Sequence, residues 1–461
     1  MSEARLRFGT DGIRGAETEL GPEFVVALGR AAAVVLAPGP GARMVMGRDT
    51  RRSGPFVESA LAAGLAAEGV AVERLGILPT PGVAWVSATE DVPAAVISAS
   101  HNVFSDNGIK FFGPGGRKLR DGAEARLQAE LDRRVATAVG AAPLAAAGQP
   151  GPAPGPVADR GDAGPAYVEH LLACLEDRRL DGLAVVLDAA HGAASGVGPE
   201  VLRRAGAEVQ VLHADPDGRN INAGCGSTHP EALCRAVVDT GADLGLALDG
   251  DADRVIAVDH RGLLVDGDQI IAVLAIDLQE RGCLRGDTVV VTVMANLGLR
   301  RAMSAQGIEV VETPVGDRHV LAALDRGGWS LGGEQSGHVI LHDLATTGDG
   351  LLTGLVLAGV VARRRTPLAE LAGSAMTRLP QVLRAVPVAG VAAGLAERVA
   401  PEVSQVQAEL GDRGRVVVRA SGTEPVVRIM VEAPTVESAE READRLAAAV
   451  MAASGSLDQA R

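Results

Sequence analysis

Apolar segments and polar turns follow one another along this chain in a regular order. Residues 44–81 contain an apolar run, a polar turn, a helical pattern and a second apolar run, which predicts a strand, a loop, a helix and a strand. The same order recurs at residues 184–212 and 288–313. In each segment a helix-ending glycine precedes the second strand: Gly69, Gly206 and Gly307. The pattern therefore predicts three related α/β units, too far apart to be the stacked repeats of a solenoid.

Two segments depart from this order. In residues 149–156 a glutamine is followed by prolines that alternate with glycine and alanine, which excludes a helix or a central strand, so we interpret them as an exposed loop that ends the first domain. The end of the chain is typical of a small α+β domain, with a helix near 392–399, strands at 415–419 and 426–431, and a helix at 438–453. We expect three similar α/β domains with mixed sheets and a C-terminal α+β domain. The expected boundaries give domains of residues 1–160, 161–258, 259–378 and 379–461.

Length and composition agree with several domains and narrow the kinds of partner. At 461 residues the chain is too long for one ordinary core. Its formal net charge of −14 argues against nucleic acid or an anionic membrane as the main partner, so local arginines and lysines have to bind any anionic ligand. Four cysteines without CxxC spacing are typical of a reduced, cytoplasmic protein. We find no pattern of a cleaved leader or a membrane span.

A polar loop at residues 97–102 is the first candidate for chemistry. An apolar run ends there in hydroxyls, an imidazole and an amide, and such strand ends often bear catalytic side chains. We interpret Ser100 as a candidate nucleophile; alternatively it only caps the turn, and His101 braces the loop. Lys110 follows in a second turn. It could exchange a proton with a substrate hydroxyl if its pKa were lowered, pair with a phosphate, or simply end a strand.

A candidate metal site follows the apolar run at residues 244–248. Asp249, Asp251 and Asp253 stand at alternate positions around a glycine and can converge on one hard cation such as Mg²⁺. The turn is not an EF-hand loop, because that loop needs glycine at its sixth position and glutamate at its twelfth. The alternative is a solvated acidic turn, which the buried strand leading into it makes the weaker interpretation.

Three further polar turns could bind an anion or a polyol. Arg14 lies in the glycine-rich segment 8–15, although a plain turn explains that segment equally well. Glu334 and Ser336 lie two residues apart in a turn that could also be a surface hairpin, and Arg318 follows another strand. The clearest anion site is the loop 419–425, because two arginines, two hydroxyls and an open backbone suit a phosphate. Its candidate residues are Arg419, Ser421, Gly422, Thr423 and Arg428, and the alternative is a solvated turn.

Taken together, these motifs resemble the α-D-phosphohexomutase superfamily, and within it the bacterial branch that acts on phosphoglucosamine. The resemblance runs nearly end to end through FGTDGIRG, SASHN, DNGIKFF, DGDADR, GEQSGH and RASGTEPVVR, and through residues 220–230. Gln335 and Gly422 fit the glucosamine branch. Two features depart from the family: Val103 stands where a proline is usual, and the glycine- and proline-rich insertion after Val139 is longer than usual.

The resemblance implies a fold around a central cleft and a role for each candidate. Ser100 would be the phosphoserine and would hold Mg²⁺ together with Asp249, Asp251 and Asp253. Arg14, His101 and Lys110 would form the rest of the transfer site. The substrate-binding residues would be Arg254, Arg318, Glu334, Ser336, Arg419, Ser421, Gly422, Thr423 and Arg428.

The activity that the resemblance implies is an isomerisation, the interconversion of glucosamine 6-phosphate and glucosamine 1-phosphate through a bisphosphate. This activity would feed UDP-N-acetylglucosamine and cell-wall synthesis. We expect Mg²⁺, a hexosamine or hexose 1,6-bisphosphate as activator, small phosphosugars as partners, a monomer or homodimer, and a kinase or bisphosphate donor that first phosphorylates Ser100. The alternatives are a mutase with relaxed preference for glucose or mannose phosphates, a phosphosugar phosphatase with Asp249 as nucleophile, and a non-catalytic sensor. The phosphatase lacks support, because Asp253 stands where its motif has threonine.

Overall fold

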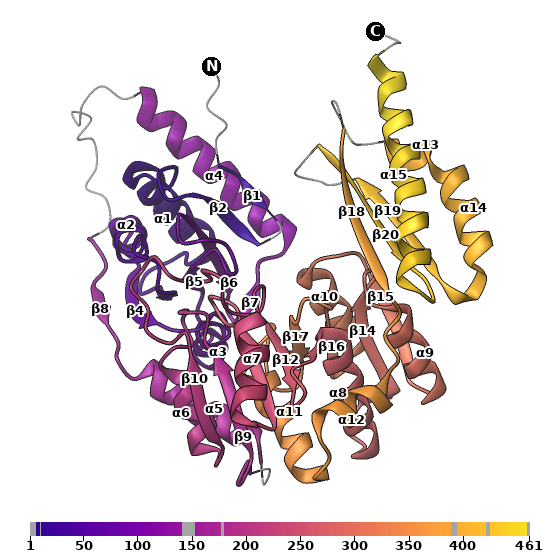
Figure 1. The fold of residues 1–461 in the computed structure, drawn as a ribbon. Helices are drawn as coiled ribbons and strands as arrows, with labels where there is room; N and C mark the ends of the chain where they lie inside the picture. The colour runs from indigo at the N-terminus through magenta and orange to yellow at the C-terminus, as the bar shows by residue number, and fades with distance from the viewer. Residues whose placement is uncertain are drawn as a thin grey trace. The chain divides into compact units, whose positions relative to one another are not determined.

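The computed structural model describes residues 6–9, 11–140, 153–176, 179–388, 394–420 and 425–458. The chain divides into two compact units. Residues 1–292 and 311–372 form the larger unit, and residues 293–310 and 373–461 form the smaller one. Each unit is built on sheets whose strands and helices are labelled in Figure 1.

The first sheet of the larger unit is mixed. Its strands lie in the order β1-β2-β6-β5-β3-β4-β8, and β7 pairs with β6. Strands β5, β3, β4 and β8 run parallel, while β6 joins β5 and β2 antiparallel. The strands are β1 (Phe8–Gly9), β2 (Gly12–Ala16), β3 (Arg43–Arg48), β4 (Ala71–Ile77), β5 (Ala94–Ile97), β6 (Asp106–Gly113), β7 (Arg117–Lys118) and β8 (Val157–Asp159).

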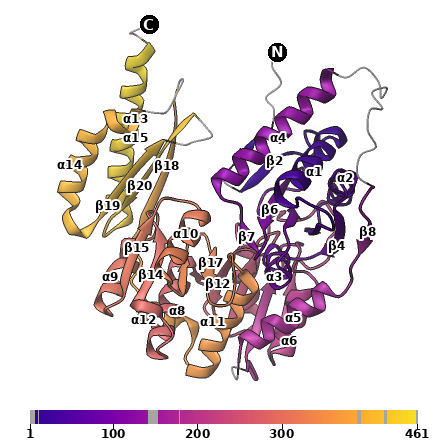
Figure 2. The ribbon, with the colours of Figure 1, turned by 180° about the vertical axis from the view of Figure 1, so that it is seen from behind.

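Helices cover both faces of this sheet, and the residues of strand β3 pack against helices on each face. Met44 and Met46 point into a core shared with α1, α2 and α4. The next position, Gly47, faces α3 so closely that a β-carbon would lie 2.5 Å from Val83. The two views of Figures 1 and 2 show these helices around the sheet. Their bounds are α1 (Pro22–Leu36), α2 (Gly54–Ala67), α3 (Thr80–Glu90) and α4 (Asp121–Gly140).

The second sheet has the order β10-β9-β11-β12-β13. Strands β10, β9 and β11 are parallel, and β12 and β13 are antiparallel. Val186 and Ala247 pack with Leu233 and Val237 of α7 on one face. The elements are β9 (Ala184–Asp188), β10 (Glu208–Leu212), β11 (Leu244–Leu248), β12 (Val255–Asp259), β13 (Leu264–Val265), α5 (Ala163–Cys174), α6 (Val197–Arg204) and α7 (Glu231–Thr240).

The third sheet has the order β15-β14-β16-β17, with β14 and β16 parallel and β17 antiparallel. Val290 packs against Val320 and Leu324 of α10. The strands are β14 (Thr288–Thr292), β15 (Glu309–Thr313), β16 (Leu331–Gly333) and β17 (Val339–Leu341). The helices in this part of the chain are α8 (Gly267–Glu280), α9 (Leu297–Ala305), α10 (Asp317–Gly327), α11 (Gly350–Arg364) and α12 (Leu368–Ala375).

The smaller unit is built on the antiparallel sheet β18-β20-β19. Alternate residues Val416 and Val418 pack under its helices. The opposite positions Val417 and Arg419 line a cavity of about 360 Å³. The elements are β18 (Gln381–Pro387), α13 (Leu395–Arg398), α14 (Ala400–Leu410), β19 (Arg415–Ala420), β20 (Val426–Glu432) and α15 (Val436–Asp458).

The strand–helix–strand order predicted at residues 44–81, 184–212 and 288–313 is confirmed in all three places. Strand β18 and helix α14 were not predicted, and the helix expected near 392–399 is the short α13, with residues 392 and 393 outside the described part. Residues 153–156 contain neither helix nor strand, as expected for this part of the proline-rich segment, and its first residues lie outside the described part.

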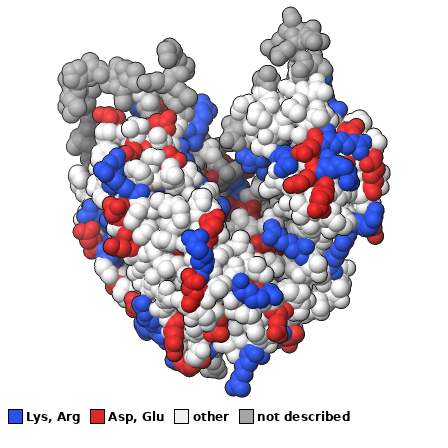
Figure 3. Space-filling model, viewed as in Figure 1, with Lys and Arg blue, Asp and Glu red and all other residues white. Residues whose placement is uncertain are grey.

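The described surface agrees with the mixed charge of the sequence. On the face drawn in Figure 3, basic and acidic side chains are interspersed on both units. Among the described residues, no helix is both long enough and apolar enough to cross a bilayer.

Candidate active site

Ser100 lies just beyond β5 in a tight turn. Its backbone has φ +53°, in the left-handed region that costs a residue with a β-carbon roughly 1 kcal/mol or more. Its backbone N–H donates to Ser98 Oγ at 2.9 Å, and Ser98 Oγ donates in turn to Asp49 Oδ2 at 2.7 Å. The turn is therefore fixed by side chains rather than by sheet pairing.

Arg51 holds the backbone of this loop. Its side chain is fully buried, and its guanidinium donates to the carbonyl oxygens of Ser100 and Asn102 at 2.9 Å each. It also donates to the carbonyl oxygens of Val103 and Asp106. A planar guanidinium with five donors suits such a ring of carbonyls. Val103 thus contributes its carbonyl, while its side chain is 57% exposed, so this role does not depend on which residue stands there.

Asn222 supports the same loop from the second domain. Its Nδ2 donates to the carbonyl oxygens of Ser100 at 2.9 Å and Asn102 at 3.0 Å. The pKa of Asp49 is raised by burial despite its ion pair with Arg51 at 2.8 Å. Nothing in the local sequence pattern marks Arg51, Asn222 or Asp49 as supports of this loop.

The three aspartates predicted as metal ligands converge beside Ser100. Asp249, Asp251 and Asp253 are all buried, and one carboxylate oxygen of each lies within 4.8 Å of the others. Ser100 Oγ donates to Asp249 Oδ2 at 2.7 Å. Burial raises the pKa of Asp249 well above its usual value, and the charges of Asp253 and Asp251 raise it further.

These carboxylates fit a divalent cation. Asp251 Oδ1 is buried and makes no hydrogen bond among the described residues, which is costly for a carboxylate oxygen unless something else binds it. A set of three converging carboxylates with a serine oxygen is the oxygen-only donor set that Mg²⁺ prefers. The residues present therefore suit the metal that the sequence predicts.

Lys110 lies among carboxylates. Its Nζ is 2.8 Å from Asp251, 3.0 Å from Asp11 and 3.4 Å from Asp253. Burial lowers the pKa of Lys110, but these three charges outweigh burial and raise it well above its usual value. The geometry favours a permanently charged cation over a proton donor and acceptor.

His101, Arg14 and Arg254 lie around Ser100 and Asp249. His101 Nδ1 lies 3.3 Å from Ser100 Oγ, and burial, then the charges of Arg254 and Arg14, lower its pKa to about 4. The backbone N–H of Arg254 donates to Asp249 Oδ1 at 3.2 Å. Arg14 forms an ion pair with Asp11.

The structure adds a charged network that the sequence does not predict. Lys118 Nζ lies 2.6 Å from Asp11 Oδ1 and also pairs with Asp317, and the buried His338 lies 3.7 Å from Asp253. Burial lowers the pKa of Lys118, but Asp11 and Asp317 raise it more. Only the contacts between distant segments show this network, since nothing in the local pattern distinguishes Lys118 from a surface lysine.

The predicted substrate-reading turns adjoin this site in the larger unit: the Val255 backbone N–H donates to the Gly337 carbonyl oxygen at 3.1 Å, and Arg318 lines a small pocket with Asp11 and Lys110. Glu334 Oε1 accepts a hydrogen bond from the Gly316 backbone at 3.1 Å, and Ser336 is exposed. Burial lowers the pKa of Arg254, but the charges of Asp253, Asp249 and Glu334 raise it more, which places Glu334 in the electrostatic environment of the aspartate cluster. Arg318 pairs with Asp121 at 2.6 Å.

In the smaller unit, two predicted phosphate ligands form a cross-strand pair. Arg419 of β19 stands directly opposite Arg428 of β20, and both line the cavity of about 360 Å³. Burial and the charge of Arg428 lower the pKa of Arg419. Like charges opposite one another are unfavourable unless an anion binds between them. Ser421, Gly422 and Thr423 lie outside the described residues.

Comparison with protein families covers almost the whole chain. The phosphoglucomutase/phosphomannomutase models match domain I at residues 5–137, domain II at 165–262, domain III at 266–379 and the C-terminal domain at 367–449. The first three are described as alpha/beta/alpha domains. The predicted fold class is confirmed.

Individual relatives agree. A phosphoglucosamine mutase of Thermobifida fusca is 54% identical over 449 residues, which are 95% of this chain and 97% of the relative. A phosphoglucomutase/phosphomannomutase family protein of Burkholderia thailandensis has a similar structure, with a TM-score of 0.78, 26% identity, and coverage of 96% of this chain and 97% of that one. N-acetylphosphoglucosamine mutase of Aspergillus fumigatus, in complex with GlcNAc-6P and magnesium, has a TM-score of 0.69 at 18% identity over 97% and 96% of the two chains.

The likeness in sequence extends over 97% of a curated relative, and the models of the family's four domains match in order. Both findings confirm the family that the motifs predicted. The chain therefore belongs to the phosphoglucosamine mutases, isomerases of the phosphoglucomutase/phosphomannomutase family.

Proposed function

We propose that this mutase interconverts glucosamine 6-phosphate and glucosamine 1-phosphate with Ser100 as the carrier of the phosphoryl group. The observation that carries this proposal is the hydrogen bond of 2.7 Å from Ser100 Oγ to Asp249 within the buried aspartate cluster. A serine oxygen beside three carboxylates has a place both for a phosphoryl group and for the cation that neutralises it.

The proposed reaction consists of two phosphoryl transfers, one from Ser100 to the sugar and one from the sugar to Ser100. A free sugar hydroxyl attacks the phosphorus of phosphorylated Ser100, the P–Oγ bond breaks, and a sugar bisphosphate forms. Ser100 Oγ then attacks the phosphorus of the phosphate that the substrate brought in, the bond from that phosphorus to the sugar oxygen breaks, the sugar oxygen regains a proton, and the isomer leaves with Ser100 phosphorylated again. His101 Nδ1 lies 3.3 Å from Ser100 Oγ, where it can accept the proton of the attacking sugar hydroxyl. Lys110 and Arg14 supply positive charge that stabilises the transferring phosphoryl group.

Asp249, Asp251 and Asp253 would hold Mg²⁺, as the family relationship and the fungal complex with magnesium support. When bound, the cation supplies charge stabilisation for the transferring phosphoryl group. Arg51 and Asn222 keep Ser100 in its turn, so that the reacting oxygen stays oriented while the phosphoryl group moves.

We assign the phosphate that is not reacting to Arg419 and Arg428, with Ser421, Gly422 and Thr423 of the same loop. The paired arginines and the cavity beside them suit a phosphate dianion. Glu334, Ser336, Arg254 and Arg318 are assigned to the rest of the substrate. A 1,6-bisphosphate of a hexosamine or hexose would serve as activator, because it can phosphorylate Ser100.

A substrate panel tests the choice of sugar. Turnover of glucosamine 1-phosphate should exceed that of glucose 1-phosphate with Mg²⁺ and a trace of hexose bisphosphate. If glucose 1-phosphate is turned over faster by a wide margin, the glucosamine assignment is wrong and the broader mutase activity remains.

Two variants test the site. Ser100→Ala should abolish turnover and the phosphate seen by intact mass, and Asp251→Asn should weaken Mg²⁺ binding at least ~10-fold. Asp239→Asn, on the exposed side of α7, is the matched control and should leave Mg²⁺ binding unchanged. Full turnover in Ser100→Ala would overturn the proposed role of Ser100.

A further inference from the structure

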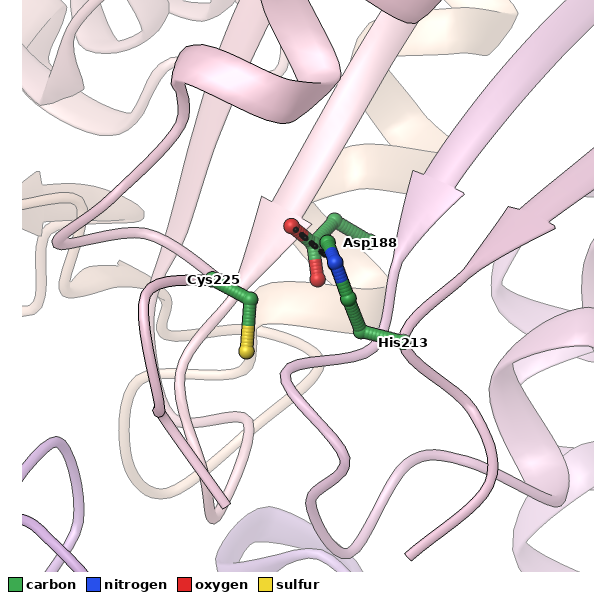
Figure 4. Close-up of side chains that lie close together, drawn as sticks. All are labelled: Asp188, His213 and Cys225. Carbon is green, nitrogen blue, oxygen red and sulfur yellow. Dashed lines mark ion pairs between the residues drawn. The ribbon is translucent and has the colours of Figure 1, made fainter. Parts of the chain in front are cut away.

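A second cluster of metal-ligand side chains lies at the carboxyl edge of the second sheet, outside the groups assigned above. Asp188 ends β9, His213 directly follows β10, and Cys225 lies in the loop before α7. Because β9 and β10 are parallel and register Asp188 with Leu212, their carboxyl ends bring Asp188 and His213 together. Figure 4 shows the three side chains approaching one another from separate segments.

The distances are those of a site that one ion can fill. A carboxylate oxygen, an imidazole nitrogen and the thiol sulfur of the three residues all lie within 4.8 Å of one another. His213 Nδ1 is 3.0 Å from Asp188 Oδ2, yet this buried nitrogen makes no hydrogen bond among the described residues. A neutral His213 can therefore offer a ring nitrogen to an ion at this point.

Other contacts fix the orientation of the carboxylate. Asp188 Oδ1 accepts the backbone N–H of Ala190 at 2.9 Å, and Oδ2 accepts that of Gly226, the neighbour of Cys225, at 2.9 Å. Asp188 and Cys225 are buried, and His213 is partly exposed, which leaves a route for an ion from solvent. Carboxylates held by hydrogen bonds in this way bind metals better than free ones.

We propose that Asp188, His213 and Cys225 form a second metal site, which takes a thiophilic divalent cation of the Zn²⁺ class. Sulfur and imidazole ligands favour Zn²⁺ over Mg²⁺, whereas the all-oxygen set of Asp249, Asp251 and Asp253 has the opposite preference. The two sites on this domain would therefore take different metals from a mixture. Three protein ligands leave the fourth position of a tetrahedral ion for water.

Charge also favours a divalent ion here. A carboxylate, a thiolate and a neutral imidazole carry two negative charges, which the ion cancels as the thiol proton leaves to solvent.

The site is coupled to the nucleophile loop through one short segment. Asn222, three residues before Cys225, holds the carbonyl oxygens of Ser100 and Asn102 with its side chain. Its backbone N–H donates to the carbonyl oxygen of Ala190 at 3.0 Å, and the backbone N–H of Ala190 donates to Asp188 Oδ1. An ion at the site would tie the two ends of this segment together and slow the exchange of its amide hydrogens.

Cobalt titration of the full-length, metal-stripped protein tests the proposal. With excess Mg²⁺ present, one equivalent of Co²⁺ should produce a thiolate charge-transfer band in the near ultraviolet, and Zn²⁺ should remove the band. Cys225→Ser should abolish the band, and Cys283→Ser, at an exposed cysteine, should leave it unchanged.

His213→Ala gives an independent reading, because its side chain is partly exposed and the variant is expected to fold even if Cys225→Ser does not. It should weaken Zn²⁺ binding at least ~10-fold and cancel any rise in Tm caused by Zn²⁺. The proposal is overturned if Co²⁺ gives no thiolate band, or if the band persists in a folded Cys225→Ser variant. Unchanged Zn²⁺ affinity in His213→Ala would overturn it as well.

Discussion

At the scale of single residues, the candidate active site depends on side chains that hold the backbone as much as on those that react. Ser100 keeps a left-handed turn that a free chain would avoid. Arg51 and Asn222 bind the carbonyl oxygens around it. The position of Ser100 Oγ beside Asp249 therefore depends on partners that do not touch the reacting atoms.

Arg51→Lys should show this dependence. Lysine keeps the charge but offers three donors instead of five, so at least two of the five side-chain hydrogen bonds that Arg51 makes to Asp49 and the loop carbonyl oxygens are lost. We expect a loss of roughly 2–4 kcal/mol in the free energy of unfolding and a fall in kcat larger than the change in KM. Urea unfolding and steady-state kinetics measure the two effects.

Arg52→Lys is the matched control for this prediction. The neighbouring Arg52 is exposed and pairs with Glu17, so its replacement should leave stability and kcat unchanged. Equal effects of the two substitutions would contradict the role assigned to Arg51.

The reacting residues could be predicted from the sequence and their supports could not. Ser100 and Asp249 follow buried strands directly, and polar groups at strand ends are visible in the local pattern. Arg51 binds a carbonyl 49 residues away, and Asn222 binds the same carbonyl from 122 residues away. Every residue has a carbonyl, so the sequence alone does not show which ones a buried arginine will hold.

At the scale of elements, close packing in the first domain depends on glycine at helix contacts. Helices α1 and α2 meet at Gly29 and Gly64, where a β-carbon would lie 2.4 Å from the carbonyl oxygen of Leu61 and 2.3 Å from that of Val26. The helical pattern predicted α2, but the pattern does not show which of its faces meets another helix backbone to backbone.

Gly64→Ala should destabilise the protein by roughly 1–3 kcal/mol, because the methyl group forces the two helices apart. Gly122→Ala is the control. Gly122 lies in the first turn of α4, where a β-carbon meets nothing within 4 Å, so alanine should stabilise by up to ~1 kcal/mol. Thermal or urea unfolding of both variants measures these changes. If both substitutions changed the free energy of unfolding in the same direction, the result would contradict the packing argument.

Helix α11 begins at a buried carboxylate. Asp349 Oδ1 accepts the backbone N–H of Leu352 at 2.9 Å, and Oδ2 accepts the Tyr167 hydroxyl at 2.7 Å. Burial nevertheless raises the pKa of Asp349 to about 6. The charged form of this cap is therefore a cost to the folded protein at neutral pH.

Asp349→Asn should change the pH dependence of stability. Because the pKa is higher in the folded chain, the folded state keeps a proton that the unfolded state loses between about pH 4 and about pH 6. The free energy of unfolding of the unchanged protein therefore falls as the pH rises through this window. Asparagine also caps helices but does not titrate. Between about pH 4 and about pH 7 the free energy of unfolding of the variant should therefore rise by up to roughly 3 kcal/mol relative to that of the unchanged protein. Parallel stability curves across this range would contradict the prediction.

Sheet order was the part of the fold that the pattern could not supply. The three strand–helix–strand units follow from local periodicity, but the antiparallel insertion of β6 between β5 and β2 depends on long-range pairing. Strand β18 was missed because its buried Val382 and Val386 are separated by exposed or charged neighbours such as Leu383 and Arg384. Its place in the sheet is fixed by β20, about 45 residues later in the chain.

At the scale of the whole molecule, an acidic chain binds anions by concentrating its cations at particular places. The net charge is −14, yet Lys110 and Arg254 lie in the larger unit beside the Ser100 loop, and Arg419 and Arg428 are paired in the smaller unit. The family could be predicted because its motifs occur in order along the chain. The shape of the substrate site cannot be read in the same way, because it depends on tertiary contacts.

The central claim, that Ser100 gives up a phosphoryl group and takes one back, is tested most directly by isotope transfer. Protein phosphorylated at Ser100 with a labelled phosphoryl group is mixed with unlabelled glucosamine 6-phosphate and followed by intact mass and sugar analysis. We predict that the label moves into glucosamine 1-phosphate or the bisphosphate while the protein stays phosphorylated. Label released as inorganic phosphate, or retained on Ser100 through many turnovers, would contradict the account.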